Sequence, residues 1–233
     1  MLNFQTLGSS SKGNCYLIRT SNEVLILECG LQFKKILQSL NFDLSKVAGC
    51  LISHEHNDHS KAINEVMSSG INVYASLGTL EALSIKGHRA FIVEAKKQFQ
   101  IGGFTILPFE LQHDAAEPLG FLIYHKEFGR LLFATDTFYI KYKFPELNYI
   151  AIECNYSGEI LNNNIREERT NSFLKKRLLG SHFSLENVKK FFLANDLSKL
   201  KEIKLLHLSD GNSNAKQFKS QIEKLTGVPV SIC

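Results

Sequence analysis

The sequence has few of the residues that define several special classes of protein. It contains 233 residues, of which only 4 are Pro and 15 are Gly, so a collagen-like protein is excluded. Its 27 basic and 23 acidic residues nearly balance and 44% of it is hydrophobic, which excludes a disordered chain. The net charge of +4 permits an acidic or phosphate-bearing partner but does not require one.

Paired cysteines and long apolar runs are also lacking. The five cysteines are scattered without a CxxC pair, so we expect neither a disulfide scaffold nor a Cys-ligated zinc ribbon. The first residues show no basic segment followed by an apolar one, so we expect no signal peptide. Apolar runs such as residues 149–152 are far too short to span a bilayer. We therefore expect a cytoplasmic protein with no membrane partner.

Short apolar runs alternate with longer amphipathic runs, which indicates a mixture of strands and helices. Strands are expected over residues 14–20, 23–28, 47–52, 71–75, 99–109 with a break at Gly102 and Gly103, 119–125, 130–134, 149–153 and 203–208. Helices are expected over residues 31–40, 61–68, 77–84, 184–194 and 213–225. Ser184 is typical of a helix N-cap. No Pro- or Ser-rich linker divides the chain, so we predict one domain over residues 1–233.

Residues 162–177 form the most polar stretch of the sequence. One interpretation is a solvated helix or loop, as is usual for runs of charge. The other is a surface that faces a phosphate-bearing substrate, because the stretch holds five basic residues: Arg166, Arg169, Lys175, Lys176 and Arg177.

The stretch that points most directly to chemistry is residues 53–59, SHEHNDH. His54, His56, Asp58 and His59 follow an apolar run, and a loop that leaves a buried strand can turn several such side chains toward one point. Imidazole nitrogens and carboxylate oxygens suit Zn²⁺, and Mn²⁺ or Fe²⁺ also accepts them. The pattern predicts a metal site.

Further donors come later in the chain, each where an apolar strand is expected to end. They are His113, Asp136 and His207. Taken alone, each of them is more often a structural residue than a ligand, but together with the loop at 53–59 they favour a shared site. His88 and His125 match no motif, and we interpret them as structural or surface residues.

The order HxHxDH, a lone His, an Asp after a strand and a late His resembles the ligand series of the metallo-β-lactamase superfamily. Finer features resemble its YycJ/WalJ-like subgroup. These are GSSSKGN at 8–14, HDAAEPLGF at 113–121, ATDT at 134–137, LKKRLLGSHFS at 174–184 and HLS at 207–209. The resemblance implies an α+β fold, specifically a four-layer αββα sandwich.

The resemblance also implies a ligand set for two divalent metal ions, with Zn²⁺ the first expectation. His54, His56 and His113 would hold the first ion, Asp58, His59 and His207 the second, and Asp136 would bridge both. Where the superfamily usually has an Asp, this sequence has Glu28, which could still support a ligand His through a hydrogen bond.

Two segments are candidates for substrate contacts. In ribonuclease Z-like phosphodiesterases a His-x-Ser/Thr stands at a helix start, and by that similarity His182 would protonate the leaving oxygen and Ser184 would contact the substrate. A plain helix-cap loop with a surface His is the alternative. The loop that holds Ser10, Ser11 and Asn14 is a second phosphate candidate, because small residues expose N–H groups, although such loops are common turns.

The sequence therefore predicts an enzyme, a binuclear metal-dependent phosphodiesterase in which Asp58 and His182 are the catalytic candidates. The subgroup resemblance implies an exonuclease-like nuclease with a nucleic-acid or nucleotide substrate. The alternatives are a small-molecule metallohydrolase, that is, a cyclic nucleotide phosphodiesterase, thioesterase or lactonase, and a non-catalytic metal-stabilised binding protein, which the complete ligand series disfavours. DNA or RNA as substrate, the polarity of cleavage and the oligomeric state, a homodimer included, stay open.

Overall fold

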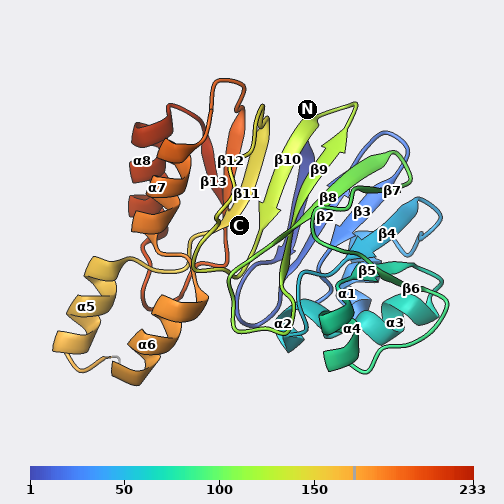
Figure 1. Ribbon diagram of the computed structural model, residues 1–233, viewed down its shortest axis with the longest axis horizontal. Coiled ribbons are helices and arrows are strands. Elements are labelled where there is room, and N and C mark those ends of the chain that lie inside the picture. The colour runs from blue at the N-terminus through green and yellow to red at the C-terminus, as the bar shows by residue number, and fades with distance from the viewer. Residues whose placement is uncertain (170–171) are drawn as a thin grey trace. The chain divides into compact units, whose positions relative to one another are not determined.

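The structure is a computed structural model that describes residues 1–169 and 172–233. The chain divides into two compact units, labelled by their elements in Figure 1. Unit 1 comprises residues 1–110 and 115–128, and unit 2 comprises residues 111–114 and 129–233. The prediction of a single domain over residues 1–233 stays a prediction.

Unit 1 contains a six-stranded sheet in the order β1-β2-β3-β4-β5-β6. The first three strands are antiparallel and the following ones are parallel. β2 and β3 are buried along almost their whole length, as expected for strands covered on both faces. The strands are β1 (Asn3–Gly8), β2 (Cys15–Arg19), β3 (Val24–Leu27), β4 (Val47–Leu51), β5 (Val73–Ala75) and β6 (Ala90–Ile92).

Short helices connect the parallel strands of unit 1 and contribute to one apolar core. Ile36, Val66 and Leu80 from three of them belong to the same buried cluster as Leu17 and Ile26 of the sheet. The helices are α1 (Phe33–Ser39), α2 (Asn57–Ser60), α3 (Ile63–Ser68) and α4 (Leu77–Ala82).

Unit 1 also holds three antiparallel strands: β7 (Phe99–Ile101), β8 (Phe104–Glu110) and β9 (Leu119–His125). The turn between β7 and β8 passes through Gly102, whose φ of +54° is a left-handed conformation that glycine adopts without a side-chain clash. The hairpin expected over residues 99–109 is therefore confirmed, with its break at the expected glycines.

Unit 2 is built on four parallel strands: β10 (Gly129–Ala134), β11 (Tyr149–Glu153), β12 (Glu202–Leu206) and β13 (Val230–Ile232). All five residues of β11 are buried, which is typical of a central parallel strand. The helices of the unit are α5 (Gly158–Arg166), α6 (Ser172–Ser181), α7 (Leu185–Ala194) and α8 (Ala215–Thr226). Ser184 caps α7 by accepting a hydrogen bond from the Asn187 N–H, as predicted.

Several elements differ from the sequence predictions. β1, β6 and β13 were not predicted, because β1 alternates exposed and half-buried residues that lack a strong apolar pattern, and the other two strands have only three residues each. The helix predicted over residues 61–68 corresponds to α3, which begins two residues later at Ile63, and a separate short helix that was not predicted, α2, lies inside the histidine loop and begins at Asn57. The first turn of α2 holds Asp58, which favours a helix N-terminus.

The polar stretch 162–177 contains the end of α5 and the start of α6, so most of its described part is helical. Residues 170–171 lie outside the described residues. Arg166, Arg169, Lys176 and Arg177 are exposed and Lys175 is half-buried, which fits the interpretation as a solvated surface.

Two further features concern the whole chain. All five cysteines are free thiols, and Cys15, Cys29, Cys50 and Cys154 are buried, whereas Cys233 is half-buried. Burial raises the pKa of the Cys15, Cys50 and Cys154 thiols well above the usual range. Within residues 1–169 and 172–233, no helix has both the length and the apolar character that a bilayer crossing needs.

Candidate metal centre

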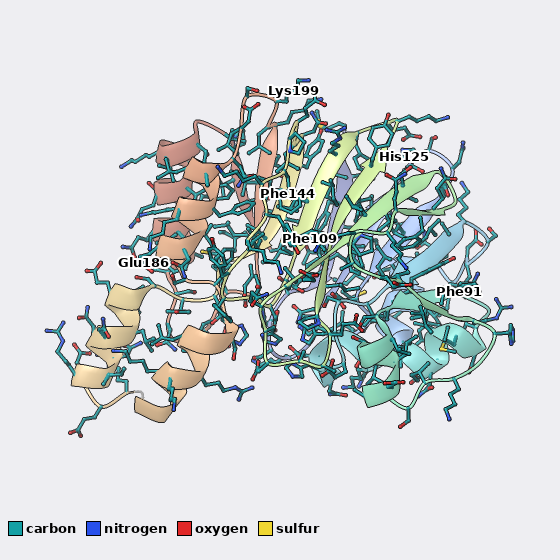
Figure 2. All side chains as sticks on the ribbon, viewed as in Figure 1. Phe91, Phe109, His125, Phe144, Glu186 and Lys199 are labelled. Carbon is teal, nitrogen blue, oxygen red and sulfur yellow. The ribbon has the colours of Figure 1, made fainter. Side chains whose placement is uncertain are left out.

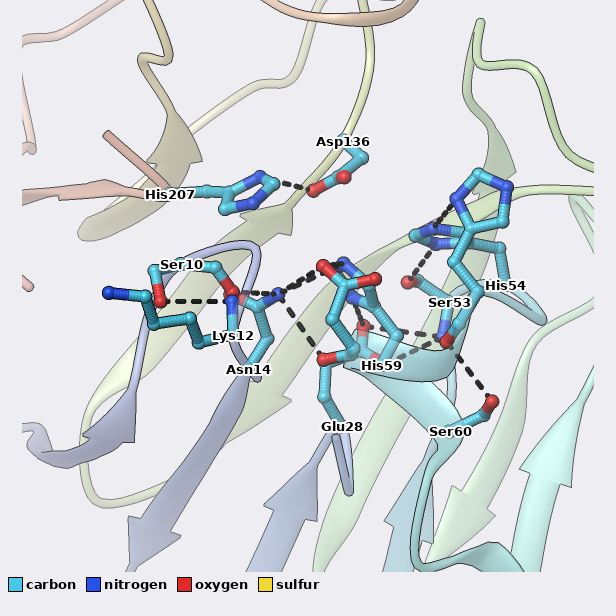
Figure 3. A network of polar contacts seen from close by, with 12 residues as sticks. Ser10, Lys12, Asn14, Glu28, Ser53, His54, His59, Ser60, Asp136 and His207 are labelled. Carbon is cyan, nitrogen blue, oxygen red and sulfur yellow. Dashed lines mark hydrogen bonds and ion pairs between the residues drawn. The ribbon is translucent and has the colours of Figure 1, made fainter. Parts of the chain in front are cut away.

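The histidine loop of unit 1 lies directly after β4 and leads into α2 (Figure 3). His54 and His59 are buried, and their ring centroids lie 4.1 Å apart. The Nε2 atom of His54 lies 3.1 Å from the Nδ1 atom of His56. The structure thus brings the predicted donors of this loop together at the carboxyl end of a buried strand.

Glu28 supports this loop from the end of β3. Its carboxylate accepts hydrogen bonds from the Ser53 N–H at 3.2 and 3.3 Å, and its Oε1 atom lies 3.7 Å from Nδ1 of His59. Glu28 has a φ of +64°, an uncommon backbone conformation for a residue with a side chain. Because Nδ1 of His59 faces this carboxylate, its Nε2 atom is the one directed toward Asp58, whose Oδ2 lies 3.4 Å away.

Asn14 holds the other side of the same pair. It is fully buried, its backbone N–H donates to the Asp58 carbonyl at 2.7 Å, and its Nδ2 lies 3.2 Å from Oδ2 of Asp58 and 3.0 Å from Nε2 of His59. Its Nδ2 also donates to the Ser10 carbonyl, and its Oδ1 accepts from the Tyr16 hydroxyl. These contacts make Asn14 a support for Asp58 and His59, and its predicted contact with substrate stays a prediction.

The remaining residues of the predicted phosphate loop are more accessible. Ser11 is exposed, and Ser10 is half-buried with its hydroxyl accepting from the Lys12 N–H at 3.2 Å. Gly30 packs directly against the histidine loop, because a Cβ at position 30 would lie 1.7 Å from the Asp58 carbonyl oxygen. This close approach requires glycine, and it fixes the backbone of Asp58 against residue 30.

Unit 2 has its own group of donors at the carboxyl ends of three adjacent parallel strands. Asp136 follows β10, Glu153 ends β11 and His207 follows β12, while His182 lies between α6 and α7. Each of the four can offer one ligand atom such that all four atoms lie within 4.8 Å of one another. Nδ1 of His207 lies 2.8 Å from Oδ1 of Asp136.

Glu153, which no sequence motif singles out, organises this group. Its carboxylate lies 2.6 Å from Nδ1 of His182 and 3.2 Å from Nδ1 of His207, and it accepts from the N–H groups of Thr137 and Phe183 at 2.9 and 3.0 Å. Glu153 is fully buried. The signal that could have found it is an acidic residue at the end of the otherwise apolar run YIAIE, since a charge at such a place needs partners.

Burial and neighbouring charges change the pKa values of the histidines in unit 2. Burial lowers the pKa of His207, but the charge and hydrogen bonds of Asp136 and Glu153 raise the pKa to about 10. Burial also lowers the pKa of His182, but the charge of Glu153 and its hydrogen bond outweigh this effect, so the pKa is raised overall. Burial, however, lowers the pKa of His113 overall. The Asp136 and Glu153 carboxylates therefore attract positive charge to this place, which a divalent cation also supplies.

His113 also belongs to unit 2. Its Nδ1 atom lies 2.7 Å from the Ser181 carbonyl, and because a carbonyl only accepts, Nδ1 carries the hydrogen. Its Nε2 atom therefore has the free lone pair that could bind a metal ion, and it lies 3.9 Å from Oδ2 of Asp136. Such a hydrogen bond to a carbonyl is the usual way in which a ligand histidine is oriented.

The other predicted residues have plain structural surroundings. The Ser184 hydroxyl accepts the capping hydrogen bond of α7, and Ser184 is buried. His125 is buried beside the rings of Phe104 and Phe128, and His88 is exposed. Imidazoles and carboxylates are the donors that Zn²⁺, Mn²⁺ and Fe²⁺ share, so each group fits a divalent ion.

Comparisons with known proteins agree with these observations. A family model described as a Beta-lactamase superfamily domain matches residues 25–151. The chain is 28% identical over 227 residues to "Exodeoxyribonuclease YycJ" of Bacillus anthracis, with 91% of this chain and 84% of the relative covered. It is 29% identical to "Exodeoxyribonuclease WalJ" of Streptococcus pneumoniae serotype 2 strain D39, with 90% and 82% covered.

Among solved structures, the metallo-beta-lactamase fold protein YhfI from Bacillus subtilis superimposes with a TM-score of 0.74 at 12% identity. The superposition covers 100% of this chain and 97% of that protein. At this identity the likeness shows the fold alone. The predicted α+β fold class is confirmed.

Proposed function

Because the chain belongs to the beta-lactamase superfamily, we propose that it is a binuclear metal-dependent phosphodiesterase that degrades nucleic acid from an end. The family and the two donor groups support the coarser part of this statement, a metal-dependent hydrolase. The names of the two exodeoxyribonucleases to which the chain is similar support the finer part, exonuclease action on a nucleic-acid substrate.

The proposal includes the ligand set that the superfamily pattern implies. In that pattern His54, His56 and His113 would hold one ion, Asp58, His59 and His207 would hold the other, and Asp136 would contribute to both. These residues would hold divalent ions, and the chemistry that such ions would supply is the activation of water and the stabilisation of negative charge on a phosphodiester. Zn²⁺ is the first expectation for both positions, with Mn²⁺ and Fe²⁺ as alternatives.

The observation that carries the proposal is the His182–Glu153 pair beside Asp136. Nδ1 of His182 is bound to the Glu153 carboxylate at 2.6 Å and lies 3.9 Å from Oδ2 of Asp136. The His182 side chain is 14% exposed, whereas those of Glu153 and Asp136 are 0% and 3% exposed. Because Nδ1 is held from the buried side, the Nε2 atom can deliver a proton to the leaving oxygen of a substrate.

The test compares leaving groups in the His182→Ala variant. An alkoxide leaving group needs a proton, so turnover of a single-stranded oligonucleotide should fall by about 10²–10⁴. Turnover of bis-p-nitrophenyl phosphate should fall much less, because nitrophenolate leaves without a proton. The exposed His88→Ala variant serves as the matched control and should retain both activities.

Metal content and substrate choice complete the test. Elemental analysis of the His182→Ala protein should show unchanged metal, and a loss of metal would mean that His182 is itself a ligand. A panel run separately with Zn²⁺ and Mn²⁺ should include a thioester and a cyclic mononucleotide. Preference for either over an oligonucleotide would overturn the nuclease proposal in favour of a small-molecule metallohydrolase.

A further inference from the structure

Unit 2 contains a cavity of about 260 Å³ that has no part in the candidate metal centre. One wall is the segment that continues from Asp136, residues 139–143, and the other is the side of α7 that follows Phe183. The volume is smaller than that of a typical pocket for a drug-sized ligand, so it suits a group of the size of one nucleobase.

The cavity is held open by hydrogen bonds between its two walls. The Phe144 N–H donates to Oδ1 of Asn195 at 2.8 Å, and Nδ2 of Asn195 donates to the Phe191 carbonyl at 2.8 Å. Nδ2 of Asn187 also donates to the Phe138 carbonyl at 3.4 Å. Both ends of the segment are thus fixed to α7 and its C-cap residue Asn195, which sets the distance between the two walls.

Its lining combines aromatic rings with positive charge. Tyr139 is 54% exposed, which is a large exposed fraction for an aromatic side chain. Tyr142 is half-buried. Lys141, Lys143 and Lys190 also line the cavity and are exposed, and no carboxylate belongs to the described lining. Single exposed lysines are ordinary, but three around two tyrosines with no acid among them make a surface complementary to a phosphate chain with bases.

The cavity lies close to the residues of the proposed chemistry. Phe183 directly follows His182, and Tyr139 is three residues after Asp136, a reach of at most about 11 Å along an extended chain. Figure 2 labels Phe144, which lies directly after the lining segment. A nucleic-acid strand whose phosphodiester lies at His182 would therefore have a neighbouring nucleotide within reach of the cavity.

We propose that this cavity binds one nucleotide of a single-stranded nucleic acid next to the scissile bond. The base stacks on Tyr139, and Lys143 and Lys190 contact the flanking phosphates. The Lys141 ammonium lies over the Tyr142 ring, 5.2 Å from its centroid, and adds positive charge beside them. This inference rests on the proposed function for its position relative to the cleaved bond. It selects single strands, because a base inside a duplex is stacked on its neighbours and offers no free face.

The test measures binding separately from hydrolysis. The probe is a fluorescein-labelled phosphorothioate oligodeoxythymidylate, which resists hydrolysis, and its anisotropy is followed with the metal-loaded protein. Tyr139→Ala should weaken binding by roughly tenfold or more, whereas Tyr139→Phe should bind as the native protein does, because only the ring is needed. The slope of log affinity against log salt concentration is negative, and Lys143→Ala and Lys190→Ala should each make it less negative by about 0.7.

Two matched variants serve as controls. Tyr124→Ala removes another exposed tyrosine, 47% exposed on β9, and Lys126→Ala removes an exposed lysine nearby in the sequence. Neither should change the binding of the oligonucleotide. Both control variants should also hydrolyse bis-p-nitrophenyl phosphate at the native rate, because Tyr124 and Lys126 lie outside the cavity.

The results separate this inference from the proposed function. If Tyr139→Ala binds the oligonucleotide as tightly as the native protein, or loses no more affinity than Tyr124→Ala, the cavity is not a nucleotide site, even if nucleic acid is hydrolysed. If the cavity variants lose affinity but no nucleic acid is cleaved with either metal, the proposed function fails and the cavity stands as a binding site for single strands.

Discussion

The donor groups of the two units are supported in opposite ways. In unit 1, His59 and Asp58 are held by several modest contacts: an amide from Asn14, a carboxylate from Glu28 and the close approach of Gly30. In unit 2, one buried carboxylate, that of Glu153, contacts two histidines and two backbone N–H groups. Removal of the Asn14 amide should therefore cost less than removal of the Glu153 carboxylate.

The physical reason lies in what each loss leaves behind. Removing a neutral amide leaves acceptors that other donors or a metal can satisfy, which costs about one hydrogen bond. Removing a buried charge leaves its partners without compensation, and such losses cost more than the interaction itself contributes. The comparison thus yields an order of expected effects.

The largest effect is expected for Glu153→Ala. Four groups lose their acceptor in a fully buried place, so the free energy of unfolding should fall by about 3–5 kcal/mol. Urea denaturation measures it, and Glu146→Gln is the matched control. Glu146 is 51% exposed and paired with Arg130, so its loss should cost no more than about 1 kcal/mol. Equal losses in the two variants would contradict the dependence of unit 2 on Glu153.

An intermediate effect is expected for Gly30→Ala, which tests the backbone support of unit 1. The new methyl group must displace the Asp58 carbonyl, so the free energy of unfolding should fall by about 1–3 kcal/mol. Gly211→Ala is the control, since a Cβ there meets nothing within 4 Å, and it should change stability by no more than about 0.5 kcal/mol. A Gly30→Ala protein as stable as the control would show that the two backbones move apart easily.

The smallest effect on stability is expected for Asn14→Ala. The backbone contacts of residue 14 persist, so the free energy of unfolding should fall by only about 1 kcal/mol. Metal affinity should fall by about tenfold, because the side chain positions Asp58 and His59. Titration with Zn²⁺ in competition with a chelator measures this change. An unchanged affinity with intact stability would mean that Glu28 and Gly30 suffice.

The sequence was most informative where its signal is local. The histidine loop was found because alternating donors directly follow an apolar run, and the cap of α7 because Ser184 immediately precedes it. Glu153 was missed because its partners His182 and His207 lie 29 and 54 residues away in the chain. Residue spacing carries no information about such a meeting, which the order of parallel strands creates.

Asn14 and the aromatic residues show the same limit. The loop around Asn14 has the composition of a phosphate-binding turn, but its side chain is turned inward by Asp58, 44 residues further on. The 17 phenylalanines and 7 tyrosines gave no indication of which rings line a cavity, because exposure depends on tertiary packing. Tyr139 became conspicuous only through its exposed ring beside α7.

The distribution of the cysteines has a practical consequence for spectroscopy. Alkylating reagents react with the thiolate, and four thiols are buried, three of them with a raised pKa, whereas Cys233 is only half-buried. A maleimide dye or spin label should therefore attach to Cys233 in the native protein without mutagenesis. A probe on Cys233, next to β13, would then report on the structure of unit 2 alone. A cysteine introduced in unit 1 could carry a second probe.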